Sequence, residues 1–301
     1  MRVKVLGSAA GGGFPQWNCG CPNCDRARRG LSGFRPRTQA QVAVSPSPRS
    51  WILLNASPDL RTQLLRDPDF APAANTRATP VSTIILLSAD VDSVMGLLHL
   101  REFQPLRVHA TPSVLRILTE ENSLFRCLER SMPPVTWEPL PPNRSVSISG
   151  LACTAIPLGG AYPDYVRDAL RRDLAKDESV IGLEFSQNGK QFFYAPSISG
   201  QTDGWKCHAA SADLALIDGT FWTDRELIDV RGAGKTARDI GHIPLSGGDG
   251  MLAQLGPATK GRRVLIHLNN TNPVLDESSD AHRAVRDAGW EVACDGMEFD
   301  L

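Results

Sequence analysis

Three cysteines near the start of the chain have the spacing of a metal site. Cys19, Cys21 and Cys24 lie in the stretch Cys-Gly-Cys-Pro-Asn-Cys. One backbone turn can direct three such thiolates at a single tetrahedral ion, and Zn²⁺ favours several thiolates without any redox change. A disulfide or a redox pair would leave one thiol over, so we expect a structural zinc. Three thiolates need a fourth ligand from another part of the chain.

A second set of polar residues has the chemistry of a metal or catalytic centre. Asp90, Asp92, Asp218 and His267 each follow a buried-looking apolar run, and His242 lies in a loop bounded by glycines. Strand ends that converge on one edge of a layered fold commonly form such a centre. Carboxylate and imidazole together suit a hydrolytic zinc site or a non-haem Fe(II) site.

Each of these residues also has a structural alternative. Asp92 precedes an expected helix and could cap it, while Asp90 could be a loop carboxylate in water. Asp218 could close a turn before a glycine. His242 could be a hydrogen-bonded loop histidine, and His267 could belong to the core. The case for function rests on the set as a whole.

The composition excludes some partners and favours none. The chain has 301 residues, of which 42% are hydrophobic and 22% charged, with a formal net charge of -1. These values are typical of a soluble globular protein and give no electrostatic case for nucleic acid or an anionic membrane as partner. No signal peptide or membrane span is evident, so we expect a reducing cytoplasm. Cys127, Cys153 and Cys294 lie in or beside apolar runs and are expected in the core.

The elements that must position these residues are strands with helices between them. The strand 2–6 runs into a glycine-rich loop, which lacks the Lys-Ser/Thr ending of a phosphate cradle and more simply shapes the cysteine site and the rim of a cleft. No linker divides the chain, so we expect one domain over residues 1–301: two sheets face to face, with helices outside. The expected strands are 38–44, 50–54, 81–87, 107–109, 180–186, 191–195, 214–217, 264–266 and 290–294. The first expected helix starts at Pro58 with Ser57 as cap and has its first apolar face over 60–65. The other expected helices are 94–101, 112–130, 165–172 within the charged stretch 164–177, and 280–288.

At this point the residues resemble a known family. Asp90-x-Asp92-Ser93-x-x-Gly96-Leu97, after an apolar strand, is similar to the H-x-H-x-D-H-x-x-G-L loop of the metallo-β-lactamase superfamily. More narrowly, nearly the whole chain resembles the pyrroloquinoline quinone (PQQ) biosynthesis protein B family. The motifs that carry this resemblance are Leu6-Gly-Ser-Ala-Ala-Gly-Gly-Gly-Phe-Pro-Gln-Trp-Asn-Cys19, Cys21-Pro-Asn-Cys24, Asn55-Ala-Ser-Pro-Asp59, Phe193-Tyr-Ala-Pro196, Asp218-Gly-Thr-Phe-Trp222, Gly241-His-Ile-Pro-Leu-Ser-Gly247 and Ile266-His-Leu-Asn-Asn-Thr-Asn-Pro273.

The resemblance implies a fold and a function. The fold would be α/β, a metallo-β-lactamase-like four-layer αβ/βα sandwich with a zinc knuckle at residues 19–24 that supports a homodimer. The function would be a step in PQQ cofactor biosynthesis, namely iron- and oxygen-dependent hydroxylation of the tyrosine ring of a Glu–Tyr-derived peptide precursor. Fe²⁺ or another divalent metal would then occupy the active site. A non-catalytic carrier or transport protein for PQQ or its precursor, and a metallohydrolase, are the alternatives.

The resemblance also assigns individual residues. Asp92 falls on the superfamily's metal-binding Asp, and His267 falls on its last metal-binding His. His242 matches a histidine that acts as acid or ligand in related phosphodiesterases. Together with Asp218, these residues form the candidate catalytic set, and Asp90 is a further candidate ligand of the active-site metal. Asn270 falls where a relative completes its zinc knuckle, but an amide is a poor zinc ligand, so the fourth ligand stays open.

This chain departs from the superfamily pattern at the metal loop. The first two histidines fall on Ser88 and Asp90, which argues against a two-metal hydrolase, and the histidine after the Asp falls on Ser93. Asp92 and His267 supply two ligands where a facial triad has three, so Asp90, His242 or water must supply the rest. We therefore expect weaker metal retention than in a relative with His at position 93. Four aromatic residues could line the pocket, although Phe193 is expected in the core: Phe193, Tyr194, Trp222 and Trp17.

Overall fold

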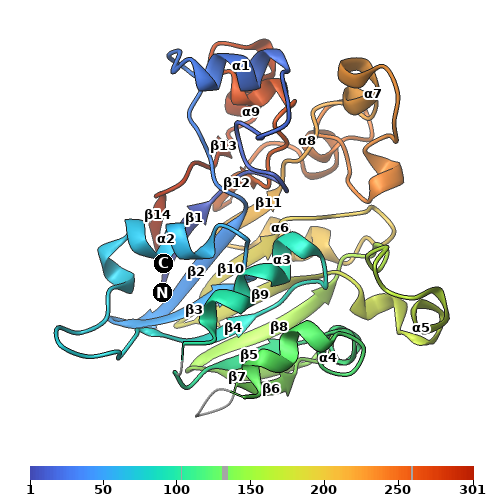
Figure 1. Ribbon diagram of the computed structural model, residues 1–301. Coiled ribbons are helices and arrows are strands. Elements are labelled where there is room, and N and C mark those ends of the chain that lie inside the picture. Colours follow the sequence, from blue (N-terminus) through green and yellow to red (C-terminus); the bar gives the residue numbers. More distant parts are fainter. Residues whose placement is uncertain (103, 131–134, 259) are drawn as a thin grey trace.

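The computed structural model describes residues 1–102, 104–130, 135–258 and 260–301, and within them the strands form two seven-stranded sheets (Figure 1). In spatial order, the first sheet contains β14 (Glu298–Asp300), β1 (Arg2–Gly7), β2 (Gln41–Ser47), β3 (Ser50–Leu54), β4 (Val81–Ile85), β5 (Arg107–Ala110) and β6 (Thr136–Pro139). The second contains β13 (Glu291–Val292), β12 (Arg262–Ile266), β11 (Leu214–Asp218), β10 (Lys190–Ala195), β9 (Ile181–Gln187), β8 (Leu151–Pro157) and β7 (Ser145–Ile148).

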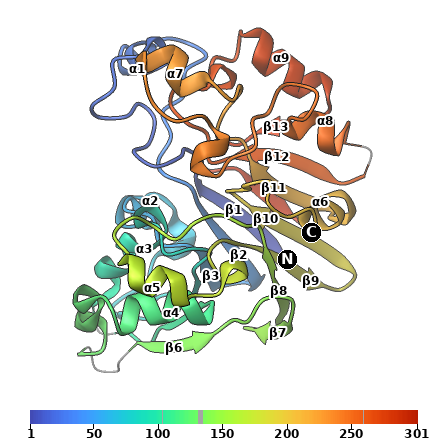
Figure 2. The same cartoon turned by 90° about the vertical axis from the view of Figure 1, so that its right-hand side faces the viewer.

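Helices cover the outer faces of both sheets. Figure 2 shows α2 to α5 on one side of the strands and α6, α8 and α9 on the other. The α-helices are α1 (Pro22–Arg28), α2 (Leu60–Arg66), α3 (Val91–Val94), α4 (Pro112–Thr119), α5 (Asp168–Asp173), α6 (Trp205–Ser211), α7 (Glu226–Arg231), α8 (Met251–Leu255) and α9 (Asp280–Asp287). Short 3₁₀ helices cover Pro68–Phe70, Met95–Leu100, Ser123–Leu128, Lys176–Glu178, Arg238–Ile240 and Pro273–Leu275. No helix in the described ranges is long and apolar enough to cross a membrane.

Strand periodicity produces the layers. Phe192 and Tyr194 of β10 face the apolar cluster between the sheets, whereas the alternate residue Phe193 faces the cluster under α6. Because both faces of the central strands are buried, their sequences are almost continuously apolar. The expected α/β sandwich, with two sheets inside and helices outside, is confirmed.

The parallel strands bring the polar strand ends to one edge. Strands β3 to β6 are parallel in the first sheet, as are β10 to β13 in the second. Backbone hydrogen bonds join the sheets at this edge, among them Leu268 N to Ser8 O at 3.0 Å and Ile181 N to Leu87 O at 3.0 Å. The segments after β4, β11 and β12 therefore meet across the gap between the sheets.

Gly96 fixes the segment that carries Asp92. A Cβ at Gly96 would lie 2.2 Å from the backbone oxygen of Ser57, so no larger residue fits without a shift of backbone. The close approach allows Gly96 N to donate to Ala56 O at 2.8 Å, while Ala56 N donates to Ser93 O at 2.7 Å. The Gly-Leu pair of the superfamily loop thus docks α3 against the end of β3.

Some local expectations were wrong. Helix α2 begins after Asp59 rather than after a Ser57 cap, and the Ser57 hydroxyl accepts from Asp59 N at 3.2 Å and donates to Gln63 at 3.1 Å. The expected helix 112–130 ends as α4 at Thr119 and resumes as a 3₁₀ helix, and the helix expected at 165–172 begins three residues later, as α5. Strand β2 starts at Gln41, and β14 was not predicted. Of the three cysteines expected in the core, Cys153 is fully buried, whereas Cys127 and Cys294 are half-buried.

Candidate metal centre

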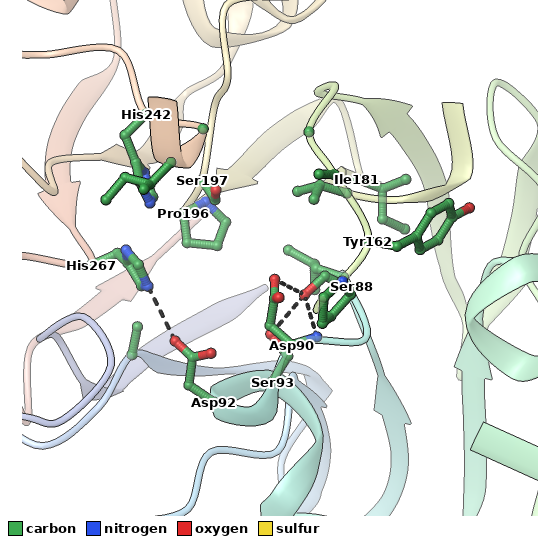
Figure 3. A pocket seen from close by; sticks show the side chains of 18 of the residues that line it. Ser88, Asp90, Asp92, Ser93, Tyr162, Ile181, Pro196, Ser197, His242 and His267 are labelled. Carbon is green, nitrogen blue, oxygen red and sulfur yellow. Dashed lines mark hydrogen bonds and ion pairs between the residues drawn. The ribbon is translucent and has the colours of Figure 1, made fainter. Parts of the chain in front are cut away.

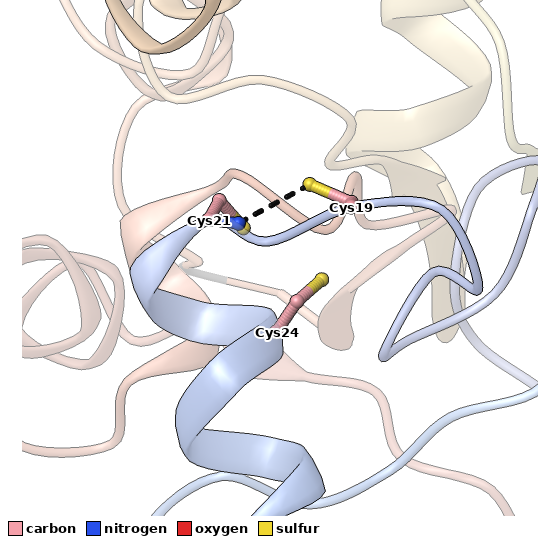
Figure 4. A group of neighbouring side chains, drawn as sticks. All are labelled: Cys19, Cys21 and Cys24. Carbon is pink, nitrogen blue, oxygen red and sulfur yellow. Dashed lines mark hydrogen bonds between the residues drawn. The ribbon is translucent and has the colours of Figure 1, made fainter.

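The three cysteines lie together at the start of α1. Their sulfur atoms are all within 4.8 Å of one another, and none forms a disulfide (Figure 4). Cys21 is the N-cap of α1, and Pro22 starts the helix with a backbone angle that proline already favours. Burial raises the pKa of the Cys21 thiol to about 11. A thiolate at that position therefore needs a cation beside it, which a bound Zn²⁺ would supply.

Asn270 reaches this cluster from the loop after β12. Its Nδ2 lies 3.1 Å from the sulfur of Cys19, 3.6 Å from that of Cys21 and 3.4 Å from that of Cys24. A half-turn of the amide would place Oδ1 in the same position, and the two orientations differ only in which partners they satisfy. The side chain of Asn270 thus lies where a fourth ligand would be needed.

Asp218 organises the second group of polar residues. It ends β11 and is fully buried. Its Oδ2 accepts hydrogen bonds from His242 Nδ1 and from Ile198 N, both at 2.8 Å. Its Oδ1 accepts from the Thr220 hydroxyl at 2.6 Å and from Thr220 N at 3.0 Å. Burial by itself would raise the pKa of Asp218, but the His242 charge and these hydrogen bonds outweigh it and hold the pKa below the ordinary value.

The hydrogen bonds fix which nitrogen of each imidazole is free. The Thr220 hydroxyl gives its proton to Asp218 and so accepts from His267 Nδ1 at 2.9 Å. His242 likewise uses Nδ1 toward Asp218. Both histidines therefore carry a proton on Nδ1, and Nε2 is the nitrogen left to bind a metal, which it does without a proton. The two rings stack with centroids 5.5 Å apart.

Asp92 faces the free nitrogen of His267. Asp92 Oδ2 lies 3.6 Å from His267 Nε2 across the gap between the sheets (Figure 3). Burial opposes the charge on both groups, but each stabilises the charged form of the other, so the pKa of Asp92 is lowered and the pKa of His267 is raised. A metal ion bound at Nε2 would take the place of the proton that Asp92 favours there. Asp92 is not the helix cap, because Asp90 occupies the N-cap of α3. The capping alternative for Asp92 is therefore wrong.

The serines and Asp90 form their own hydrogen-bonded group beside Asp92. Ser88 Oγ lies 2.9 Å from Asp90 Oδ2 and 3.1 Å from Ser93 Oγ (Figure 3). Burial and the nearby Asp92 charge raise the pKa of Asp90. Ser93 is thus engaged with Ser88 at the position where the superfamily has a histidine.

These side chains lie at the bottom of a cavity of about 480 Å³. Asp90, Asp92, His242 and His267 line it, whereas Asp218 does not and lies behind His242. The walls and rim are formed by residues that include Tyr162, Pro163, Val180, Ile181, Pro196, Ser197, Lys235 and Arg238.

The expected aromatic lining was wrong. Phe193 and Tyr194 are fully buried in the apolar layers on the two faces of β10, as the core reading of Phe193 predicted. Trp17 is 85% exposed on the cysteine loop, and Trp222 packs against the cluster under α6. Tyr162 is the aromatic side chain that lines the cavity. Thr220 was not predicted as a site residue, although it lies in the motif Asp218-Gly-Thr-Phe-Trp222.

Comparison with known proteins shows the family and the fold. Residues 50–268 match a family model described as Beta-lactamase superfamily domain. Coenzyme PQQ synthesis protein B of Methylobacterium nodulans is 41% identical, over the full length of both chains. The chain belongs to the coenzyme PQQ synthesis protein B family. The crystal structure of Zn²⁺-bound PqqB from Methylobacterium extorquens aligns with this chain over the full length of both, at 40% identity and a TM-score of 0.93. A diphosphatase of the PhnP family, at 16% identity and a TM-score of 0.70, shares the fold.

The cysteine cluster gives a first prediction. We expect about one tightly held zinc per chain in protein purified without added metal, because three thiolates in one tetrahedral site bind zinc far more tightly than surface side chains do. Cys21→Ser should lose this zinc, whereas Cys207→Ser, which removes an exposed thiol outside the cluster, should retain it. Elemental analysis of the three proteins measures this. Equal zinc content in all three would contradict a zinc site at the cluster.

Glu226 joins the loops that carry the two groups. This buried carboxylate accepts from Trp222 N at 2.6 Å and from the Thr271 hydroxyl at 2.5 Å. Burial raises its pKa from 4.5 to about 7 despite these hydrogen bonds. The folded state therefore favours the protonated form. The associated stability is complete below pH 4.5 and is lost as the pH rises through 7, by up to about 3 kcal/mol.

Glu226→Gln should remove this pH dependence. We expect the variant to melt at a higher temperature than the unaltered protein at pH 8.5, and to show no such advantage at pH 5. Thermal unfolding at both pH values, in the same zinc-containing buffer, measures the difference. Glu129→Gln, at an exposed position, is the control and should leave both melting temperatures unchanged. An offset for Glu226→Gln that is the same at both pH values would refute the assignment.

Proposed function

We propose that this chain acts in the synthesis of PQQ, as a metal-dependent oxygenase of the tyrosine ring of a precursor derived from a Glu–Tyr peptide. Membership of the coenzyme PQQ synthesis protein B family supports the pathway. The oxygenation step rests on the donor set at the bottom of the cavity. We further propose that the chain works in the cytoplasm as a homodimer.

The observation that carries the proposal is the pair of histidines that line the cavity beside one carboxylate. The donor atoms of Asp218, His242 and His267 all lie within 4.8 Å of one another, but Asp218 is engaged with Nδ1 of His242 and does not line the cavity. We therefore propose that Asp92, which faces His267 Nε2, supplies the carboxylate of a two-histidine, one-carboxylate set that suits non-haem Fe(II) with coordination positions left open. Iron held there would supply the redox chemistry by which one O₂ hydroxylates the tyrosine ring and oxidises it to the ortho-quinone, so that the second oxygen atom leaves as water and no further reductant is needed. In this proposal Asp218 and Thr220 are positioning residues, because they touch the imidazoles from behind and do not line the cavity.

The rest of the cavity has matching roles. Asp218 and Thr220 keep a proton on Nδ1 of each histidine, so that Nε2 stays available. The side chains of Ile181, Pro196 and Tyr162 form an apolar wall against which a ring can pack and exclude water. Because Asp90 accepts a hydrogen bond from Ser88, we assign it to the polar surroundings of the metal and not to the residues that bind it.

One observation favours a second candidate. Ser93 is hydrogen-bonded to Ser88 and adds no strong ligand, which weakens the hold on any metal. A non-catalytic carrier of PQQ or its precursor is therefore the alternative function. A two-metal hydrolase is disfavoured, because Ser88 and Asp90 stand where the superfamily loop has its first two histidines.

Oxygen consumption separates these functions. With Fe²⁺ and a glutamyl-tyrosine peptide under air, we expect oxygen uptake in step with loss of the peptide, and we expect His267→Ala to abolish both. An oxygen electrode with product analysis makes the measurement. Binding of the peptide without oxygen uptake would support the carrier and overturn the oxygenase.

Ser93→His should restore the missing ligand. We expect the variant to hold Fe²⁺ at least about tenfold more tightly in a chelator titration, because an imidazole replaces a hydroxyl that binds iron weakly. Ser197→His places an imidazole elsewhere on the same cavity and is the matched control, with little expected change. Iron binding by the unaltered protein that is as tight as in Ser93→His would contradict this account.

A further inference from the structure

Two basic side chains line the cavity and come from a part of the sequence far from Asp90 and Asp92, which form its floor. Lys235 and Arg238 lie between α7 and the loop of His242, and both are exposed. Neither belongs to the donor set described above, and the sequence motifs did not include them. Because residues 238–242 all line the cavity, this segment forms one continuous wall that runs from the basic side chains to His242.

The backbone of this segment is held in place. Ala237 N donates to Asp224 O at 2.8 Å, and Arg238 N donates to Asp224 Oδ1 at 3.0 Å. His242 N donates to Ala237 O at 3.0 Å. The backbone that carries Arg238 is therefore held relative to His242, and Lys235 precedes it by three residues, while the side chains of both cations are exposed to water.

The ammonium group of Lys235 has no acidic partner among the described residues. Across the described ranges, it forms no ion pair or hydrogen bond. The nearby Asp239 feels its charge, but Asp239 already accepts from Thr236 N at 2.9 Å. Arg238 donates from one terminal nitrogen to Asp249, whose carboxylate is 80% exposed. Donors of both cations are therefore free to bind an anion.

The acidic side chains at the rim are already occupied. Asp164 pairs with Arg171 at 3.2 Å, and Asp239 accepts from Thr236 N at 2.9 Å. At the floor, Asp90 and Asp92 repel an anion and attract a metal ion. The cavity thus has an acidic floor, an apolar wall at Ile181 and Pro196, and a basic rim. A ligand that matches this order has an aromatic ring inside and a carboxylate at the mouth.

We propose that Lys235 and Arg238 form a carboxylate-binding subsite, which selects an anionic substrate and directs its ring toward Asp92 and the two histidines. This inference rests on the proposed function for the placement of the ring. Arginine binds a carboxylate through paired N–H groups and lysine through its compact charge, so the two together favour a carboxylate over a neutral group of the same size.

A comparison of an acid with its ester tests the subsite. The probes are glutamyl-tyrosine and its ester, in which every carboxylate is methylated, titrated anaerobically without iron into the zinc-containing protein by calorimetry. We expect the unaltered protein to prefer the acid at least tenfold. Lys235→Gln should weaken binding of the acid about fivefold and leave the ester unchanged. Lys235→Gln with Arg238→Gln should abolish the preference. The preference should also decrease as salt is added, because both cations are exposed.

Lys206→Gln is the matched control. Lys206 of α6 pairs with Asp203, which precedes the helix, and Lys206 does not line the cavity. This variant should therefore bind both probes as the unaltered protein does. Equal weakening of acid and ester in Lys235→Gln, no preference in the unaltered protein, or no binding of either probe would overturn the subsite. No oxygen or iron takes part, so a failure of oxygenation would leave the predicted preference intact, and loss of the preference would leave oxygen uptake to be judged separately.

Discussion

The buried carboxylate of Asp218 is the constraint on which the candidate site depends. A charged group with no access to water must be satisfied by hydrogen bonds, and Asp218 obtains them from Ile198, Thr220 and His242. Because the Thr220 hydroxyl donates to Asp218, it must accept from Nδ1 of His267, so Asp218 also orients this second histidine. One buried charge therefore sets the orientation and the protonated nitrogen of two imidazoles that come from different loops.

The cysteine cluster and the histidine site share one loop. His267 ends β12, and Asn270 of the same loop reaches the three cysteines. The side chain of Asn272 donates to Gly219 O at 2.9 Å, and Thr271 donates to Glu226. The loop after β12 is thus fastened to the cluster at one end and to the loop after β11 at the other. A zinc ion at the cluster would stiffen the loop that carries His267 without touching the cavity.

The layered fold and the residues of both sites could be predicted because apolar strand patterns and quoted motifs mark them directly. Helix ends were less predictable, as α4 shows, since it ends at Thr119 although apolar residues continue through the next 3₁₀ helix to Leu128. The sequence could not show which face of β10 carries Tyr194, nor that Thr220 links Asp218 to His267. Nor could it show that Lys235 and Arg238 share a cavity with Asp92, because that depends on how a loop after α7 packs against another sheet.

The central claim is that Asp92, His242 and His267 hold one metal ion while Asp218 stays behind His242. Anomalous diffraction from crystals of the protein loaded anaerobically with Fe²⁺ tests it most directly. The account predicts one iron peak within bonding distance, about 2.0–2.2 Å, of Asp92 Oδ2 and of the Nε2 atoms of His242 and His267, with His242 Nδ1 still bonded to Asp218. Iron bound to Asp218 with His242 displaced, or no iron at this position, would contradict it.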